Sequence, residues 1–118
     1  MSEFAVSRKD VDEISVLSIE GYLDAHTAPN FEETIRQLVE EGRYKMIVNF
    51  AKLSYISSAG LGVFMGFIED IRSHGGDIKL SNMNEKVFKI FDLLGFPSLY
   101  DIMGNETEAM SKFQESKN

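Results

Sequence analysis

The sequence lacks cysteine altogether, which excludes disulfide bonds, thiolate metal sites and cysteine nucleophiles. It also lacks any apolar run near the ~20 residues that a membrane-spanning helix needs. The N-terminal segment MSEFAVSRKDVDE has no apolar stretch of the kind that forms the core of a signal peptide. We therefore expect a cytoplasmic protein that does not insert into a membrane.

Positive charge is scarce. Twelve lysine and arginine residues stand against 19 aspartate and glutamate residues, which gives a net charge of −7. Nucleic acids and anionic membranes repel such a protein at long range. The composition therefore predicts no direct binding to nucleic acid and favours a protein partner with a basic or mixed surface.

Sequence motifs of common catalytic and cofactor sites are also absent. No GxxxxGK[ST] phosphate loop occurs. His26 and His74 are far apart, and neither is followed by a carboxylate at the helical spacing of a metal site. A hydrolase nucleophile elbow requires glycine two residues before its serine, whereas Ile56 occupies that position before Ser58. We expect no enzymatic activity, no metal and no cofactor.

Length and composition favour a single domain. The chain has 118 residues, of which 43% are hydrophobic and 26% charged, as is typical of a globular domain. We assign the domain to residues 1–118, with an ordered core from about residue 4 to 114 and a frayed end at Lys117 and Asn118.

The spacing of apolar residues predicts the secondary structure. Two strands near 4–11 and 14–19 form an antiparallel pair, which Gly21 and Asp24 end. A helix begins around Pro29 and ends at Gly42, and a buried central strand follows near 44–50. A helix near 58–74 is followed by a strand near 77–81 and a helix near 87–94. A weak edge strand near 99–102 and a last helix capped by Asn105 complete the chain. The predicted fold class is α/β, with a mixed, mainly parallel sheet of four to five strands, an antiparallel edge strand and about four helices.

The segment SYISSAGLGVFMG leads into the helix near 58–74. Glycine costs about 1 kcal/mol relative to alanine inside a helix, yet this helix contains Gly60, Gly62 and Gly66. Its main apolar stripe, which we expect to face the sheet, consists of Leu61, Phe64, Ile68 and Ile71. Two interpretations are open. Either the glycines allow close packing against neighbouring elements, or they form an exposed docking surface together with Val63 and Phe67.

Ser57 and Ser58 occur at the start of this helix. A serine at such a position ordinarily caps the helix by accepting an amide hydrogen bond. The alternative is phosphorylation, since free amides and the helix dipole stabilise a phosphoryl group at a helix N-terminus. The residues alone leave both interpretations open. Asp24 follows a strand end, and in a mainly parallel sheet its loop is expected near the serine pair.

Several segments of the sequence resemble the STAS family, and in particular the bacterial anti-sigma-factor antagonists. The matching segments are GYLD at 21–24, TA at 27–28, IVNF at 47–50 with Leu53, and ISSAGLG at 56–62. The pair Gly75-Gly76, the strand that follows it and the helix ending at Leu94-Gly95 extend the resemblance over essentially the whole chain.

The resemblance implies a function and a site. In that family a D-S-[ST]-G-L-G motif carries a phosphoacceptor serine, a role that falls here on Ser58, with Ser57 as the second choice. The unphosphorylated domain is expected to bind an anti-sigma factor with serine kinase activity and so to free a sigma factor. Phosphorylation is expected to break this complex, and a PP2C-type serine phosphatase to reverse it. The expected partner-binding residues are Asp24, Thr27, Ser57, Ala59, Gly60, Gly62, Val63 and Phe67.

The motif departs from the family pattern at two positions. Ser57 replaces the aspartate, and Ala59 replaces the second serine or threonine. The first change removes a negative charge beside the acceptor. Two other functions remain as alternatives: a STAS subunit that serves a transporter or phosphatase assembly, and a small-ligand or nucleotide-binding domain.

Overall fold

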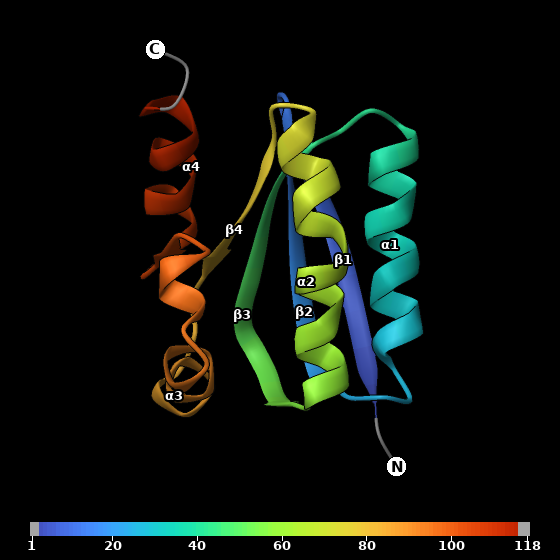
Figure 1. Cartoon of the computed structure of the whole chain (residues 1–118), viewed down its shortest axis with the longest axis vertical. Coiled ribbons are helices and arrows are strands. Elements are labelled where there is room, and N and C mark those ends of the chain that lie inside the picture. The colour runs from blue at the N-terminus through green and yellow to red at the C-terminus, as the bar shows by residue number, and fades with distance from the viewer. Residues whose placement is uncertain (1–2, 116–118) are drawn as a thin grey trace.

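The strands form one sheet in which sequence neighbours are also spatial neighbours. The computed structural model describes residues 3–115, and its strands are β1 (Phe4–Val11), β2 (Ile14–Leu23), β3 (Lys45–Ile56), β4 (Asp77–Ser81) and β5 (Ile102–Met103). They lie in the order β1-β2-β3-β4-β5 (Figure 1). The β1–β2 pair is antiparallel, and the other three pairs are parallel. The predicted α/β fold class, with an antiparallel edge strand, is confirmed.

Helices cover both faces of this sheet. The helices are α1 (Ala28–Glu40), α2 (Ser58–Ser73), α3 (Glu85–Leu93) and α4 (Glu106–Glu115), with a 3-10 turn η1 at Phe96–Ser98. Figure 1 shows α1 and α2 side by side in front of the strands. The main core lies between the sheet and helices α1, α2 and α3. It includes Phe31, Phe50, Phe64 and Phe91. A second cluster joins Ala109 and Phe113 of α4 to Val16 and Ile47.

Strand β3 is the central strand that the sequence predicts. Val48 belongs to the main core, whereas the adjacent Ile47 packs against α4, and successive residues of a strand point to opposite faces. The strand is longer than predicted and continues to Ile56. Register shifts in its pairing with β2 occur between Ser18 and Glu20 and between Gly21 and Tyr22.

Most predicted element boundaries agree with the structure. Gly42 and Gly95 follow α1 and α3 with φ of 78° and 77°, the left-handed conformation in which helices commonly end. The amide oxygen of Asn105 accepts a hydrogen bond from Glu108 N at 2.9 Å, as expected of a cap. Gly21 does not end its strand, because its φ of 92° accommodates the irregular pairing and β2 continues to Leu23.

The fraying predicted for Lys117 and Asn118 falls outside the described residues. Across residues 3–115, every helix is too short or too polar to cross a membrane.

Candidate functional site

The candidate site lies where β2 and β3 end together. Leu23 and Ile56 are paired in the parallel register, and Ser57 N donates a hydrogen bond to Leu23 O at 2.9 Å. The next residue after Leu23 is Asp24, and the next after Ser57 is Ser58. The two loops are therefore neighbours, as expected at the carboxyl edge of a parallel sheet.

Gly60 makes this close approach of α2 to β2 feasible. A Cβ atom at Gly60 would lie 2.7 Å from Leu23 O and 2.9 Å from Ile56 Cγ1, which is closer than real Cβ contacts. Gly60 is buried. The packing interpretation therefore holds at this position, and the expectation that Gly60 contacts a partner stays a prediction.

The two serines have different roles in the helix start. Ser57 is the N-cap residue, and its Oγ accepts a hydrogen bond from Gly60 N at 3.4 Å. Ser58 is the first helical residue and is exposed. Its hydroxyl has no hydrogen-bond partner within residues 3–115. The cap interpretation of Ser58 is therefore wrong, and its hydroxyl is available without loss of the cap.

Thr27 and Asp24 hold the loop between β2 and α1 in shape. Thr27 Oγ1 donates to Tyr22 O at 2.7 Å and accepts from Asp24 N at 3.0 Å. The Asp24 carboxylate accepts from His26 N at 2.9 Å and Thr27 N at 3.1 Å. Thr27 is only 5% exposed, so it supports the loop from within, and the expectation that it contacts a partner stays a prediction. Asp24 is half-buried and keeps an accessible side.

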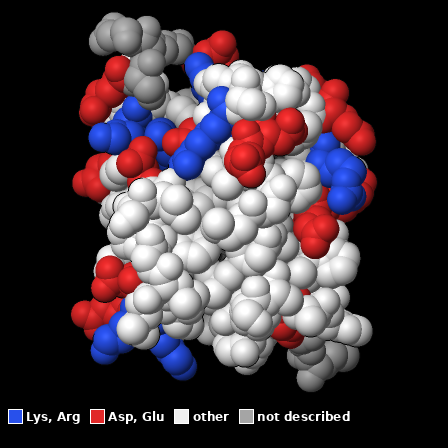
Figure 2. All heavy atoms as spheres, viewed as in Figure 1, with Lys and Arg blue, Asp and Glu red and all other residues white. Residues whose placement is uncertain are grey.

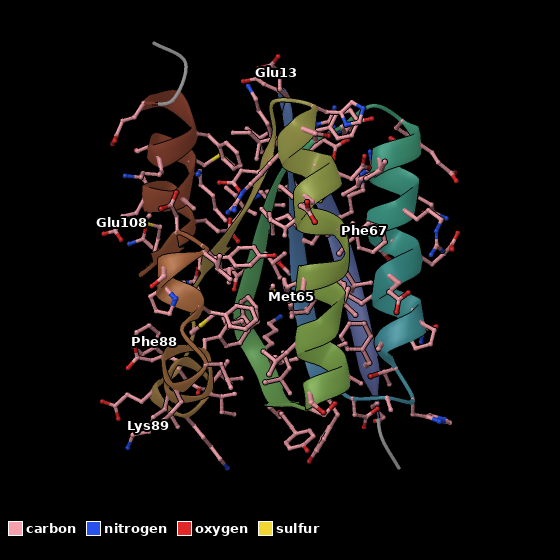
Figure 3. The ribbon with its side chains drawn as sticks, in the orientation of Figure 1. Glu13, Met65, Phe67, Phe88, Lys89 and Glu108 are labelled. Atoms are coloured by element: carbon pink, nitrogen blue, oxygen red, sulfur yellow. The ribbon has the colours of Figure 1, made fainter. Side chains whose placement is uncertain are left out.

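Helix α2 buries more of its circumference than the sequence pattern indicates. Its predicted stripe of Leu61, Phe64, Ile68 and Ile71 is buried, as expected. Val63 is also buried, at 3% exposure, because α2 packs against α1 as well as the sheet. The expectation that Val63 belongs to an exposed docking surface is therefore wrong. Phe67 is half-buried on the side of α2 that faces α1 (Figure 3).

From Ser58 to Gly66, the exposed side of α2 is smooth and uncharged, whereas Glu69 and Asp70 are exposed further along the helix. A Cβ atom at Gly62 or Gly66 would meet nothing within 4 Å, and Met65 between them is 47% exposed. We call the exposed residues Ser58, Ala59, Gly62, Met65 and Gly66 the α2 strip. Figure 2 shows charged side chains around the rim of this face and a broad uncharged centre, which α2 crosses. The open interpretation of the glycines therefore fits Gly62 and Gly66.

Comparison with known proteins identifies the family. The family model of the STAS domain matches residues 5–109 of this chain. This chain belongs to the STAS family. It is 34% identical over 86 residues to the anti-sigma-B factor antagonist of Bacillus subtilis, which covers 73% of this chain and 78% of that protein. It is 30% identical over 98 residues to the anti-sigma-B factor antagonist of Staphylococcus epidermidis, with 82% and 91% covered.

Solved structures agree with this STAS assignment. A putative anti-sigma factor antagonist from Thermotoga maritima has a TM-score of 0.83 at 25% identity and covers 91% of this chain and 92% of that one. The unphosphorylated form of the anti-sigma factor antagonist SpoIIAA has a TM-score of 0.71 at 24% identity, with 93% and 98% covered. A separate structure describes SpoIIAA from Bacillus in its phosphorylated form, with a TM-score of 0.72 at 24% identity and 92% and 99% covered. The SpoIIAA comparisons confirm the STAS fold.

One exposed feature of this STAS domain was missed by reasoning from the sequence. Tyr22 and Tyr55 are paired in register at the ends of β2 and β3, and their ring centroids are 6.0 Å apart. They are 46% and 48% exposed. No sequence signal shows this pairing, because the register shifts between the two strands cannot be seen in either strand alone.

Proposed function

We propose that this STAS domain, residues 1–118, is a cytoplasmic anti-sigma-factor antagonist that acts by partner switching. In its unphosphorylated form it binds an anti-sigma factor with serine kinase activity, and a sigma factor is released. Phosphorylation of Ser58 ends this binding, and a PP2C-type serine phosphatase restores it. The protein acts by binding and catalyses no reaction. The relatives named anti-sigma-B factor antagonist support this function, and the free hydroxyl of Ser58 is the observation that carries the site.

The geometry favours Ser58 over Ser57 as the phosphoacceptor. The Ser57 hydroxyl caps α2 through Gly60 N, and the Ser57 amide is bonded to Leu23 O. A kinase would have to break this cap to use Ser57. Ser58 is exposed and caps nothing, so its reaction leaves the helix start intact. Ser57 remains the second choice.

The expected switch changes the surface while the fold is kept. A phosphoryl group on Ser58 adds about −1.5 to −2 charge at one end of the α2 strip. The first amides of α2 and the helix dipole stabilise that charge in the free protein. A partner that covers the strip has to remove water from the phosphate, which is costly without a compensating cation. Binding is therefore lost although α2 stays folded.

The test uses the cognate anti-sigma factor, ATP and serine variants. We expect one phosphate per chain, and we expect peptide mapping to place it on Ser58. Ser58→Ala should abolish this phosphorylation, and Ser57→Ala should retain it. Ser58→Asp should weaken binding of the anti-sigma factor. Ser98→Asp is the matched control, because it adds the same charge at an exposed serine of η1.

Two outcomes would each reject one part of this proposal. Phosphate that persists in Ser58→Ala would reject the acceptor, and equal binding of wild type and Ser58→Asp would reject expulsion by charge. Capture of a transporter ATPase, or saturable binding of a nucleotide to the isolated domain, would favour the two alternative functions.

A further inference from the structure

Tyr22 and Tyr55 form an exposed aromatic pair beside the start of α2, where Ser57 and Ser58 lie. Each is followed in the chain by a residue that points into the core, Leu23 and Ile56, which are 0% and 3% exposed. The tyrosine rings therefore point away from the core, tilted at 40° to each other. Tyr55 precedes Ser58 by three residues. The pair is thus connected to the acceptor serine through a short segment of chain.

Irregular strand pairing determines where these rings lie. The register of β2 and β3 shifts immediately before Tyr22, and again a few residues earlier. Such bulges redirect side chains and are common beside functional sites. Two tyrosines left half-exposed next to each other keep large apolar surfaces in water. Aromatic residues that become buried when a partner binds are the commonest anchors of protein interfaces.

Among the described residues, the surroundings of the pair carry excess negative charge. A surface hollow of about 590 Å³ beside Tyr22 is lined, within residues 3–115, by two carboxylates, Glu3 and Glu20, and by one cation, Lys52. Asp24 follows two residues after Tyr22. Tyrosine ring faces are themselves attractive to cations. The chemistry that fits this surface is an arginine or lysine side chain placed over the rings.

We propose that Tyr22 and Tyr55 anchor the anti-sigma factor through a cationic side chain, next to the α2 strip. The identity of the occupant rests on the proposed function. The argument for one common partner is continuity, since the Ser57 N to Leu23 O bond joins the strand end that carries Tyr22 to the start of α2. The tyrosines contribute to affinity, and Ser58 controls whether the partner remains.

Site-specific photocrosslinking in the source bacterium tests this placement. A benzophenone amino acid replaces Tyr55 in one variant, Met65 of the α2 strip in a second and Leu93 in a third, since Met65 is 47% exposed and already carries a large side chain. Leu93 is the control, because it is 81% exposed but lies at the end of α3. We expect positions 55 and 65 to give an adduct with the same anti-sigma factor, lost when Ser58→Asp is added, and position 93 to give none.

The outcomes separate this inference from the proposed function. An anti-sigma-factor adduct at 65 without one at 55 overturns the anchor and leaves the function standing. An adduct at 55 with a different protein, or with a second copy of this chain, also overturns the anchor. An adduct at 55 with the anti-sigma factor that Ser58→Asp leaves unchanged supports the anchor and rejects the switch. No adduct at either position rejects both.

Affinity measurements with the purified anti-sigma factor give an independent result. We expect Tyr22→Ala/Tyr55→Ala to raise Kd by roughly tenfold or more, as for interface anchors in general. Tyr22→Phe/Tyr55→Phe keeps both rings and should retain most of the affinity, and Leu93→Ala should have no effect. Circular dichroism and thermal melts confirm that each variant is folded. A folded alanine variant with wild-type affinity would overturn the anchor.

Discussion

The first turn of α2 lies so close to the end of β2 that a Cβ atom at Gly60 would be 2.7 Å from the carbonyl oxygen of Leu23. Two residues further along the same helix, a Cβ atom at Gly62 would meet nothing within 4 Å. The same residue type therefore serves two purposes in one helix. Gly60 allows two backbones to approach each other, and Gly62 leaves a surface smooth.

Alanine substitutions should separate these two purposes in stability. Gly60→Ala should lower the free energy of unfolding by about 1–3 kcal/mol, because a backbone atom has to move to relieve the overlap. Gly62→Ala should raise it by about 0.5–1 kcal/mol, since alanine restricts the unfolded chain and favours the helix. Urea denaturation monitored by circular dichroism measures both. A Gly60→Ala variant as stable as wild type would show that the contact relaxes freely.

Alanine substitutions in the α2 strip should stabilise the fold but weaken binding of the partner. Gly62→Ala/Gly66→Ala adds two methyl groups to the exposed side of α2 and should stabilise the helix by up to about 2 kcal/mol. The same methyl groups should hinder a partner that packs closely against the strip and therefore raise its Kd. Gln37→Ala, at an exposed position of α1, is the control for a general effect of helix stabilisation. Unchanged affinity in the double glycine variant would exclude close packing at the strip.

The fold was predictable because its signals are periodic. Alternation in the strands and the stripe containing Phe64 and Ile68 require no knowledge of neighbours, and the structure confirms them. Val63 was placed wrongly because its burial depends on α1, and the sequence of α2 does not state which side of it α1 covers. Gly60 and Gly62 could not be distinguished for the same reason, since they differ only in what surrounds them.

The start of α2 was predictable, but its cap residue was not. Sequence patterns leave helix boundaries uncertain by a few residues, and the Ser57–Ser58 pair makes the cap ambiguous by one position. The resemblance to a known family selected Ser58, and the structure shows that Ser57 is the cap. The pairing of Tyr22 with Tyr55 could not be predicted, because two register shifts between β2 and β3 determine it.

The cap assignment predicts a difference between the two serines in the unphosphorylated protein. Ser57→Ala should lower the free energy of unfolding by about 1 kcal/mol, because Gly60 N loses its acceptor. Ser58→Ala should change it by less than about 0.5 kcal/mol, as for other surface positions. Ser57→Asp should restore stability, since aspartate caps helices as well as serine does. Chemical denaturation of the three variants measures this, and the reverse order for the two alanine variants would assign the cap to Ser58.

Stability in acid should depend on Arg8, which joins β1 to the end of α1. Its guanidinium donates to Glu41 at 2.6 and 2.8 Å and to both Asp10 oxygens at 3.0 Å. These hydrogen bonds hold the pKa of Asp10 and the pKa of Glu41 below their ordinary values. The unfolded chain therefore binds more protons in acid than the folded protein does. The stabilisation is present above the ordinary carboxylate pKa of about 4 and is lost as the pH falls through the lowered folded-state values.

Arg8→Met keeps the aliphatic stem and removes the charge, so it should flatten the loss of stability between about pH 5 and pH 3. The effect should be small, because all three side chains are partly exposed and water screens their interaction. Lys9→Met, at the next position of β1, removes the same charge from an exposed side chain and is the matched control. Urea midpoints measured from pH 7 to pH 3 should show a shallower acid limb for Arg8→Met than for Lys9→Met or wild type. Parallel acid limbs for all three proteins would show that the Arg8 hydrogen bonds add nothing to folding.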